Sequence, residues 1–290
     1  MAEKKWDGKT KGSLWGYRFF IFLIHYLGLN IAYFFCFWIS LWYLFFNSKA
    51  RKGVMQFYQK GLGYSSWSAF WNARKNFYQF GTTLIDRVAF KTKHKTKFNY
   101  HFNLEEILIE MAKSGKGGFL FSAHLGNWEN AGNLIKERIT SKINVVMLDE
   151  EVQKIKNYLQ KEVGESDYQL IAIKDDFSHL IAIHAALQRN ELVAMHADRL
   201  FEGAKKVKLP FMKSFAEFPL GPFTMAIKFK APVTFVYAIK SASYTYQLSA
   251  TPVMHFDSVA DLAQAYAKEL EKMATSNPNQ WFNFYPYFVS

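Results

Sequence analysis

The sequence has very little cysteine. Cys36 is the only cysteine among 290 residues, and it lies within an apolar run. A single thiol cannot form an intramolecular disulfide, so the chain gives no sign of an oxidising compartment. The shortage also excludes the cysteine clusters of structural zinc sites. Because the chain also lacks a His-Glu-x-x-His pattern, we expect no metal site.

Charge is missing from one long stretch. Residues 19–46 contain no Asp, Glu, Lys or Arg, and about 20 apolar residues are enough to span a bilayer. His25, Gly28 and Asn30 interrupt the first part, so the cleanest span is 29–46. No small-residue cleavage site follows, which argues against a removed signal peptide. We expect a hydrophobic membrane-anchoring helical region that spans the bilayer or dips into it. A buried hairpin of core helices is the alternative.

Acidic residues are scarce between 49 and 97. This region holds eleven Lys or Arg residues but only one acid, Asp86, and it is rich in aromatics. The whole chain carries a formal charge of +12. Next to an anchor, this composition fits an interfacial helical region on an anionic membrane; stacking on single-stranded nucleic acid is the alternative. The densest basic tract, 91–97, is either a solvated loop or a docking surface for an acidic carrier protein.

From about residue 100 onward, short apolar runs alternate with helical patterns. We expect strands at 118–123, 143–148, 168–173, 191–198, 231–240 and 244–253, and helices at 104–113, 127–140, 150–161, 177–189, 223–229 and 262–274. Repeated β-α-β units predict an α/β fold with a central, mostly parallel sheet flanked by helices. Three regions are expected: 1–48 as the basic N-terminus and anchor, 49–100 as the interfacial region, and 101–290 as the α/β domain.

The strand expected at 118–123 leads into His124. Open α/β sheets carry their sites at this carboxyl edge. Asn127 is suited to cap the following helix, and Glu129 falls in its first turn. Glu129 lies five residues after His124 and is expected to turn back toward the imidazole. A histidine oriented by a carboxylate can take a proton from a hydroxyl; a structural histidine is the alternative.

Two further segments carry candidate binding residues. The strand at 191–198 ends in His196-Ala197-Asp198-Arg199 at the same sheet edge as His124, so the two motifs are expected to share a cleft. Asp198 is suited to bind a backbone amide or an acceptor hydroxyl, and Arg199 is suited to bind a phosphate or an oxyanion. The alternative is that Asp198 and Arg199 form a salt-bridged pair at the end of the strand.

A basic loop is expected next. It contains Lys208, and Gly221 lies in a Pro-Leu-Gly-Pro turn that starts a helix. Lysines and a helix N-terminus suit a phosphorylated ligand. An ordinary loop with solvated lysines is the alternative.

Taken in order, these motifs resemble the bacterial lipid A late acyltransferases (lauroyl and myristoyl transferases), which are related to the H-x4-D/E glycerolipid acyltransferases. The resemblance covers the anchor, His124 to Glu129, the strand ending in Asp198, and segments 207–211, 221–222, 230–233 and 278–282. Two features depart from the family pattern. The closing cluster 285–288 has no arginine, and between the first motif and Asp198 residues 149–161 offer only lysines, at 154, 156 and 161. Residues 6–10 and 16–18 also look like family members tied to aryl polyene or flexirubin-type pigment lipids.

The resemblance implies transfer of a fatty acyl chain from an acyl carrier protein thioester to a hydroxyl of a membrane glycolipid or related pigment lipid, with no cofactor. It implies His124 as the general base oriented by Glu129. Substrate-binding residues would be Asp198, Arg199, Asn127, Lys208 and Gly221. The expected partners are the acyl carrier protein, the lipid acceptor and an anionic membrane surface rather than nucleic acid. The expected location is the bacterial inner membrane, with the site on the cytoplasmic side.

Two other functions remain open on the sequence alone. One is a glycerol-phosphate or lysophospholipid acyltransferase, which would differ in taking a phosphate-sized acceptor. The other is a non-catalytic, membrane-anchored protein that binds lipid or polyanions through the region 49–97. Such a protein would bind polyanions in a salt-sensitive manner that does not depend on His124.

Overall fold

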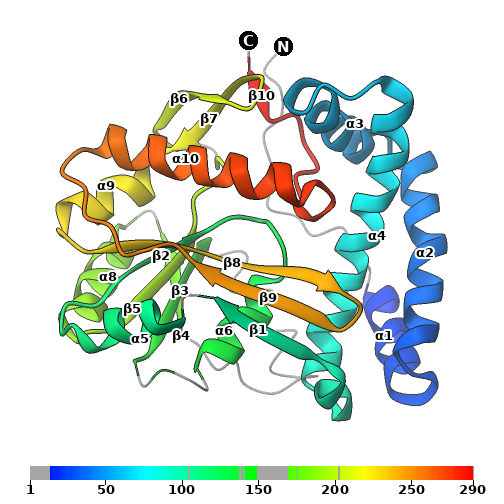
Figure 1. Cartoon of the computed structure of the whole chain (residues 1–290), viewed down its shortest axis with the longest axis horizontal. Coiled ribbons are helices and arrows are strands. Elements are labelled where there is room, and N and C mark those ends of the chain that lie inside the picture. Colours follow the sequence, from blue (N-terminus) through cyan, green and yellow to red (C-terminus); the bar gives the residue numbers. More distant parts are fainter. Residues whose placement is uncertain are drawn as a thin grey trace.

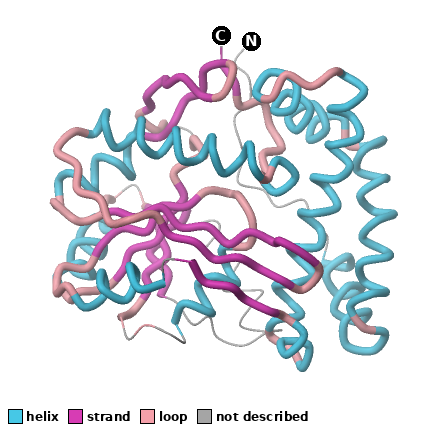
Figure 2. The backbone as a smooth tube through the Cα atoms, viewed as in Figure 1, coloured by secondary structure: helices cyan, strands magenta, loops and turns pink. Residues whose placement is uncertain are grey.

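The computed structural model of the chain describes residues 14–103, 105–136, 139, 141–148, 169–174, 176–201 and 203–289. The helix expected at 150–161 and the N-terminal motif at 6–10 lie outside the described residues. Strands gather in the middle of the molecule and helices surround them (Figure 2). The chain begins with a group of helices that lies to one side of the sheet (Figure 1). These are α1 (Leu14–Phe22), α2 (Leu29–Phe46), α3 (Ser48–Gln56) and α4 (Ser66–Phe90).

The apolar span predicted at 29–46 is helix α2. Gly28, with φ of +87°, separates it from a short π-helical turn at Leu23–Leu27. Among the described residues, α2 is the one helix that is long and apolar enough to cross a membrane, and 28% of it is buried. Its buried side repeats every three to four residues and packs along α4 (Figure 1): Leu29, Ala32, Cys36, Ser40 and Leu44. The opposite side exposes large aromatic residues, including Phe34, Trp38 and Trp42.

A buried polar cluster ties α2 and α4 to the sheet. Asp86 of α4 is fully buried and accepts hydrogen bonds from Tyr33 of α2 and Tyr246. The Nζ atom of Lys240 lies 2.7 Å from Oδ2 of the same carboxylate. Buried charges are stable only when they are paired and hydrogen-bonded, so this cluster fixes the position of the anchor helix against the rest of the protein.

The central sheet has the order β1-β9-β8-β2-β5-β3-β4. Its strands are β1 (Asn99–Asn103), β2 (Gly118–Ser122), β3 (Ile143–Leu148), β4 (Gln169–Ile173), β5 (Leu192–His196), β8 (Val233–Ala242) and β9 (Thr245–Ala250). All neighbouring strands run parallel except β8 and β9. The predicted α/β fold with a mostly parallel sheet is therefore confirmed.

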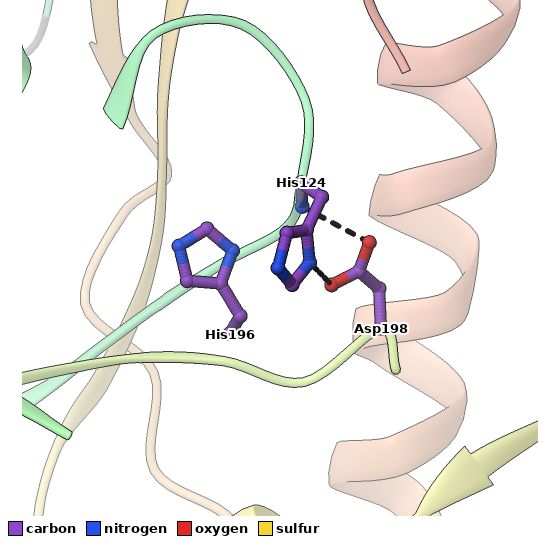
Figure 3. Close-up of side chains that lie close together, drawn as sticks. All are labelled: His124, His196 and Asp198. Carbon is purple, nitrogen blue, oxygen red and sulfur yellow. Dashed lines mark hydrogen bonds and ion pairs between the residues drawn. The ribbon is translucent and has the colours of Figure 1, made fainter. Parts of the chain in front are cut away.

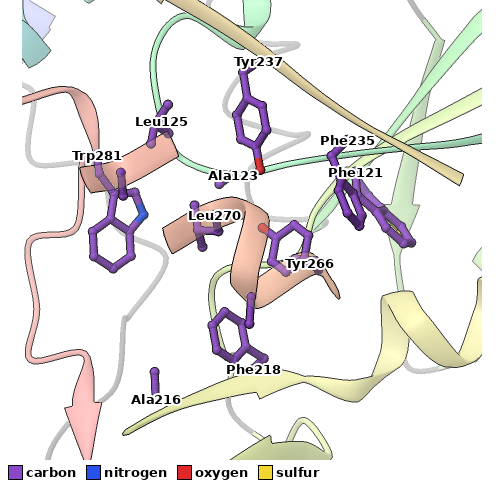
Figure 4. Packing of buried hydrophobic residues seen from close by; sticks show 14 of the residues in the cluster. Phe121, Ala123, Leu125, Ala216, Phe218, Phe235, Tyr237, Tyr266, Leu270 and Trp281 are labelled. Carbon is purple, nitrogen blue, oxygen red and sulfur yellow. The ribbon is translucent and has the colours of Figure 1, made fainter. Parts of the chain in front are cut away.

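Helices cover both faces of this sheet. One face packs against α8 (Ser178–Gln188), α9 (Leu220–Lys228) and α10 (Val259–Ser276). The other packs against α5 (Glu105–Lys113) and α6 (Trp128–Lys136), while α2 and α4 contribute residues to the cores on both faces. Figure 4 shows Tyr266 and Leu270 of α10 beside Phe121 and Ala123. The Tyr266 hydroxyl donates to the Ser122 carbonyl at 2.7 Å, which fixes the end of β2.

The prediction of a basic loop after residue 198 is wrong for residues 206–219. This segment forms β6 (Lys206–Phe211) and β7 (Ser214–Pro219), which pair with β10 (Phe288–Val289) in a small antiparallel sheet. Val207, Leu209 and Phe211 alternate with polar or exposed residues, and this period of two is typical of a half-buried strand. The lysines of this segment therefore project from a hairpin.

The basic tract 91–97 is folded onto the anchor. Lys93–Lys97 forms a turn of 3₁₀-helix, and the buried His94 places Nε2 2.9 Å from the carbonyl oxygen of Ile24. Lys93, Lys95 and Lys97 are exposed. The tract therefore presents its charges from a fixed position beside the start of the anchor.

Candidate active site

Parallel pairing of β2 and β5 brings two of the predicted motifs together. Ser122 and His196 are register partners, and the amide of Ala197 donates to the Ser122 carbonyl. Both strands end at this carboxyl edge of the sheet. β2 leads into His124, and β5 leads into Asp198. The structure therefore places the two motifs side by side, as their shared sheet edge predicted.

Asp198 is the carboxylate that meets the imidazole of His124 (Figure 3). Its Oδ1 lies 2.8 Å from Nδ1 of His124, and its Oδ2 accepts the His124 backbone N–H at 3.0 Å. Nε1 of Trp281 donates to the same Oδ2 at 3.2 Å. Burial by itself raises the pKa of a carboxyl, but the charge and hydrogen bond of His124, with Arg199 nearby, hold the pKa of Asp198 well below its usual range. Asp198 is therefore ionised at neutral pH.

Glu129 occupies a different place from the one expected. Its Oε2 lies 2.9 Å from Nε of Arg87 on α4, and the same Nε lies 3.3 Å from Oδ1 of Asn127. The sequence analysis expected Glu129 to orient the imidazole, but the carboxylate on Nδ1 is that of Asp198. The reason is that α6 begins at Trp128, and its first turn directs Glu129 toward α4. Glu129 fixes the start of α6 against α4.

The loop between His124 and α6 is clamped on both sides. Gly126 has φ of +73°, and a Cβ atom there would lie 2.0 Å from the carbonyl oxygen of Ala238. Its N–H donates to the Gln280 carbonyl, the Asn127 N–H to the Ala238 carbonyl, and the Phe282 N–H to the His124 carbonyl. Only glycine fits here, and the loop holds His124 between β8 and the C-terminal segment.

His196 stands beside the catalytic candidate. Its ring centroid lies 4.4 Å from that of His124, with the planes inclined by 42°. The ring of Trp128 lies on it edge to face, at 5.2 Å. Burial lowers the pKa of His196 well below its usual value, and the neighbouring His124 lowers it further. His196 is therefore neutral at physiological pH.

His124, His196 and Asp198 form a group whose ligand atoms lie within 4.8 Å of one another. Such a group has the composition of a metal site. However, both oxygens of Asp198 already accept N–H donors, and Nδ1 of His124 is one of the partners. A cation between them would have to replace these hydrogen bonds, so the arrangement fits an oriented base better than a ligand set.

The remaining predicted residues are spread over several elements. Asn127 is fully buried and donates to the Tyr246 hydroxyl at 3.3 Å, in addition to its contact with Arg87. Arg199 donates to the Phe282 carbonyl at 2.6 Å. Lys208 is exposed in the middle of β6, with Nζ 5.0 Å from the ring centroid of Phe215. Gly221 is exposed in the first turn of α9.

An apolar cavity begins at His196 and Ser122 and runs along the sheet face beneath α5 and α6. Its walls include Leu108, Leu120, Trp128, Val145 and Ala194. Asn103, Tyr237 and Ser249 also line the cavity, but its surface is almost entirely apolar, so it suits a hydrocarbon group.

Two parts of this site were absent from the sequence prediction. Arg87 lies 40 or more positions before its partners, and no spacing rule connects a helix residue to a loop that far along the chain. Trp281 fell within a segment that matched the family, but its bond to Asp198 depends on the return of the C-terminal segment across β8.

Comparison with known proteins gives one full-length match. The model of the family described as bacterial lipid A biosynthesis acyltransferase matches residues 3–289. No curated protein matches the chain. Among solved structures, the chain is similar to the 1-acyl-sn-glycerophosphate (LPA) acyltransferase PlsC from Thermotoga maritima. That alignment has a TM-score of 0.38 and 12% identity, and it covers 86% of this chain and 96% of that chain.

Proposed function

Because the chain belongs to the bacterial lipid A biosynthesis acyltransferase family, and is therefore an acyltransferase, we propose that it moves a fatty acyl chain from an acyl carrier protein thioester to a hydroxyl of a lipid. The acceptor is a lipid A-like glycolipid or a related outer-membrane or pigment lipid. The observation that carries the proposal is the His124–Asp198 pair, whose imidazole lies beside His196, a residue that lines an apolar cavity.

His124 is the general base in this proposal. Asp198 accepts the Nδ1 proton in a hydrogen bond, which leaves the lone pair on Nε2 for the acceptor hydroxyl. The ionised carboxylate also stabilises the imidazolium that forms when Nε2 takes the proton. General-base help of this kind contributes on the order of 10²–10⁴ in rate. The alkoxide then attacks the thioester directly, without a covalent acyl-enzyme.

Glu129 supports the base from a distance. Its ion pair with Arg87 joins the first turn of α6 to α4, and both residues flank the loop that carries His124. A carboxylate in this turn also stabilises the N-terminus of α6. Glu129 thereby holds the loop in the position that the reaction needs, and Arg87 shares this role.

The apolar cavity accommodates the acyl chain. Each buried methylene contributes about 0.8 kcal/mol, so the depth of the cavity sets the preferred chain length. The acyl carbonyl then lies near His196 and Ser122, which line the end of the cavity that is nearest to His124.

The family is associated with the bacterial inner membrane. The exposed aromatic side of α2 supports insertion of this helix into lipid. Exposed lysines at 93, 95 and 97 support contact with anionic lipid or an acidic carrier protein. The proposal places the active site on the cytoplasmic side, where acyl carrier protein is found.

Lipid mass spectrometry tests the proposed function. A strain in which the protein is deleted should lose one acyl chain from a specific lipid, and the wild-type protein should restore it. His124→Ala should fail to restore it, because the base is missing. His255→Ala, which changes an exposed histidine, should restore it fully. Identical profiles in the deleted and restored strains, with pigment lipids included in the extraction, would contradict the proposal.

A further inference from the structure

His196 is a half-buried titratable side chain that the mechanism above does not use. Figure 3 shows its ring beside that of His124, with one nitrogen turned toward the other ring. On its other side it contacts Trp128. His196 therefore stands between the base and the wall of the acyl cavity.

The Nδ1 atom of His196 is buried and has no hydrogen-bond partner among the described residues. A buried nitrogen without a partner costs free energy, on the order of 1–3 kcal/mol. A functional site is one place where such a group is retained, because a bound ligand can supply the missing partner. The nearby Asp198 is not that partner, since its oxygens are occupied by His124 and Trp281.

The position of this nitrogen identifies the group that it meets. His196 lines the cavity proposed for the acyl chain, and it also contacts the base that activates the acceptor hydroxyl. The thioester carbonyl is the only part of the acyl donor that lies at both places at once. The carbonyl oxygen is also a hydrogen-bond acceptor in an otherwise apolar surrounding.

We propose that His196 is a further catalytic residue, whose Nδ1–H donates a hydrogen bond to the thioester carbonyl oxygen and stabilises the oxyanion. This role rests on the proposed function. It requires a neutral imidazole, which burial favours, and a proton on Nδ1. A neutral donor also avoids placing a second cation against His124 when that ring becomes protonated.

The step is balanced as follows. Nε2 of His124 takes the hydroxyl proton while the acceptor oxygen forms a bond to the carbonyl carbon. The π-electron pair moves onto the carbonyl oxygen, where His196 donates its hydrogen bond. The pair then returns, the carbon–sulfur bond breaks, and the thiolate takes the proton from His124. The products are an oxygen ester and a free thiol.

Three replacements of His196 separate a hydrogen-bond donor from a packing residue. His196→Asn keeps an N–H close to the position of Nδ1, His196→Gln moves it to the position of Nε2, and His196→Phe keeps only the ring. We expect His196→Phe to lower kcat by about 10²–10³, as loss of one oxyanion donor does, with little change in KM for the acyl donor. His196→Gln should behave like His196→Phe, and His196→Asn should stay within about tenfold of wild type.

A donor whose carbonyl oxygen is replaced by sulfur gives a second measurement. Sulfur accepts hydrogen bonds weakly, so wild type should prefer the thioester over the dithioester strongly. His196→Phe should lose about tenfold or more of that preference, and His196→Asn should keep it. Loss of packing alone would slow both substrates equally. The His255→Phe variant, at an exposed position, is the control for an unchanged ratio.

Either of two results would overturn the inference: His196→Phe with wild-type kcat, or equal losses for both substrates in a variant whose thermal unfolding matches wild type. If His196→Phe does not fold, the comparison of His196→Asn with His196→Gln decides, because both keep a polar side chain. Absence of transfer by wild type would instead contradict the proposed function itself.

Discussion

At the scale of single residues, Asp198 determines the state of the base. It accepts three N–H donors, from the ring and backbone of His124 and from Trp281. One carboxylate therefore selects the tautomer of His124 and also fixes the backbone from which the ring projects. Because both contacts come from the same side chain, the loop cannot shift without also losing the orientation of the base.

Replacing Asp198 by Asn tests this dual role. The amide can place its NH₂ group against Nδ1, which would move the imidazole proton to Nε2 and remove the base. Loss of the orienting charge in such a pair costs on the order of 10⁴ in turnover, and we expect a loss of that order here. Single-turnover acyl transfer measures it, and Asp257→Asn, at an exposed position, is the control. Activity within tenfold of wild type would exclude the orienting role.

The same variant has a defined dependence of stability on pH. The folded-state pKa of Asp198 is lowered, so its stabilising contribution is complete above the unfolded-state pKa, about 3.9. It is lost as pH falls below that value toward the folded-state pKa. The difference in thermal unfolding temperature between wild type and Asp198→Asn should shrink as pH falls below about 4. A difference that grows over this acidic range would contradict the ionised state of Asp198.

At the scale of elements, the turn at Gly126 joins β2 to α6 and sets the direction in which His124 points. This turn combines a left-handed backbone with a close approach to Ala238, and each of these constraints alone favours glycine. Backbone contact with Ala238 therefore fixes how closely the turn between β2 and α6 approaches β8. His124 is positioned by the packing of three segments of the chain, and not by its own side chain alone.

Gly126→Ala should destabilise the protein and abolish transfer. Gly115→Ala is the matched control: Gly115 also has a positive φ, +75°, but a Cβ atom there would meet nothing within 4 Å. The control should lose about 1–3 kcal/mol from backbone strain alone, and Gly126→Ala should lose more because the added atom meets a carbonyl. Chemical unfolding and acyl transfer measure the two effects. Equal losses in the two variants would show that the close contact with β8 is unimportant.

Local patterns predicted most of these elements, and their limits have physical reasons. Strands such as 143–148 were predictable because a buried parallel strand is a short apolar run bounded by polar residues. The 206–219 hairpin was missed because its lysines obscured the alternation. Placing His124 and Asp198 at one edge followed from parallel topology. Topology did not predict whether Asp198 or Glu129 orients the imidazole of His124. Both are carboxylates near His124, and only the three-dimensional path of the loop distinguishes them.

At the scale of the whole molecule, the two sides of α2 have different surroundings. One side packs along α4 over the length of the helix, and the other exposes Phe34, Trp38 and Trp42. An exposed aromatic surface of this extent is unfavourable in water and favourable at a membrane interface. Under the proposed function, this side of α2 lies in the lipid that holds the acceptor.

Trp42→Glu should reduce the membrane-bound fraction without unfolding the protein. Trp42 is 55% exposed, so its replacement removes little packing, whereas a carboxylate is disfavoured by both apolar and anionic lipid. Phe215→Glu, at a residue of similar exposure (45%) on β7, is the control and should keep its binding. Sedimentation with vesicles that contain anionic lipid measures both. Equal binding by Trp42→Glu and wild type would contradict insertion of this side of α2.

The buried cluster around Asp86 has a consequence for the membrane attachment proposed above. A flexible linker between a membrane anchor and an enzyme can be shortened, exchanged or removed, and the enzyme still works in solution. Here Tyr33 of the anchor helix binds the same carboxylate as Lys240 of β8, and β8 also binds the loop that holds His124. Movement of α2 is therefore coupled to the His124 loop, and if α2 inserts as proposed, the bilayer becomes part of the frame in which that loop is aligned.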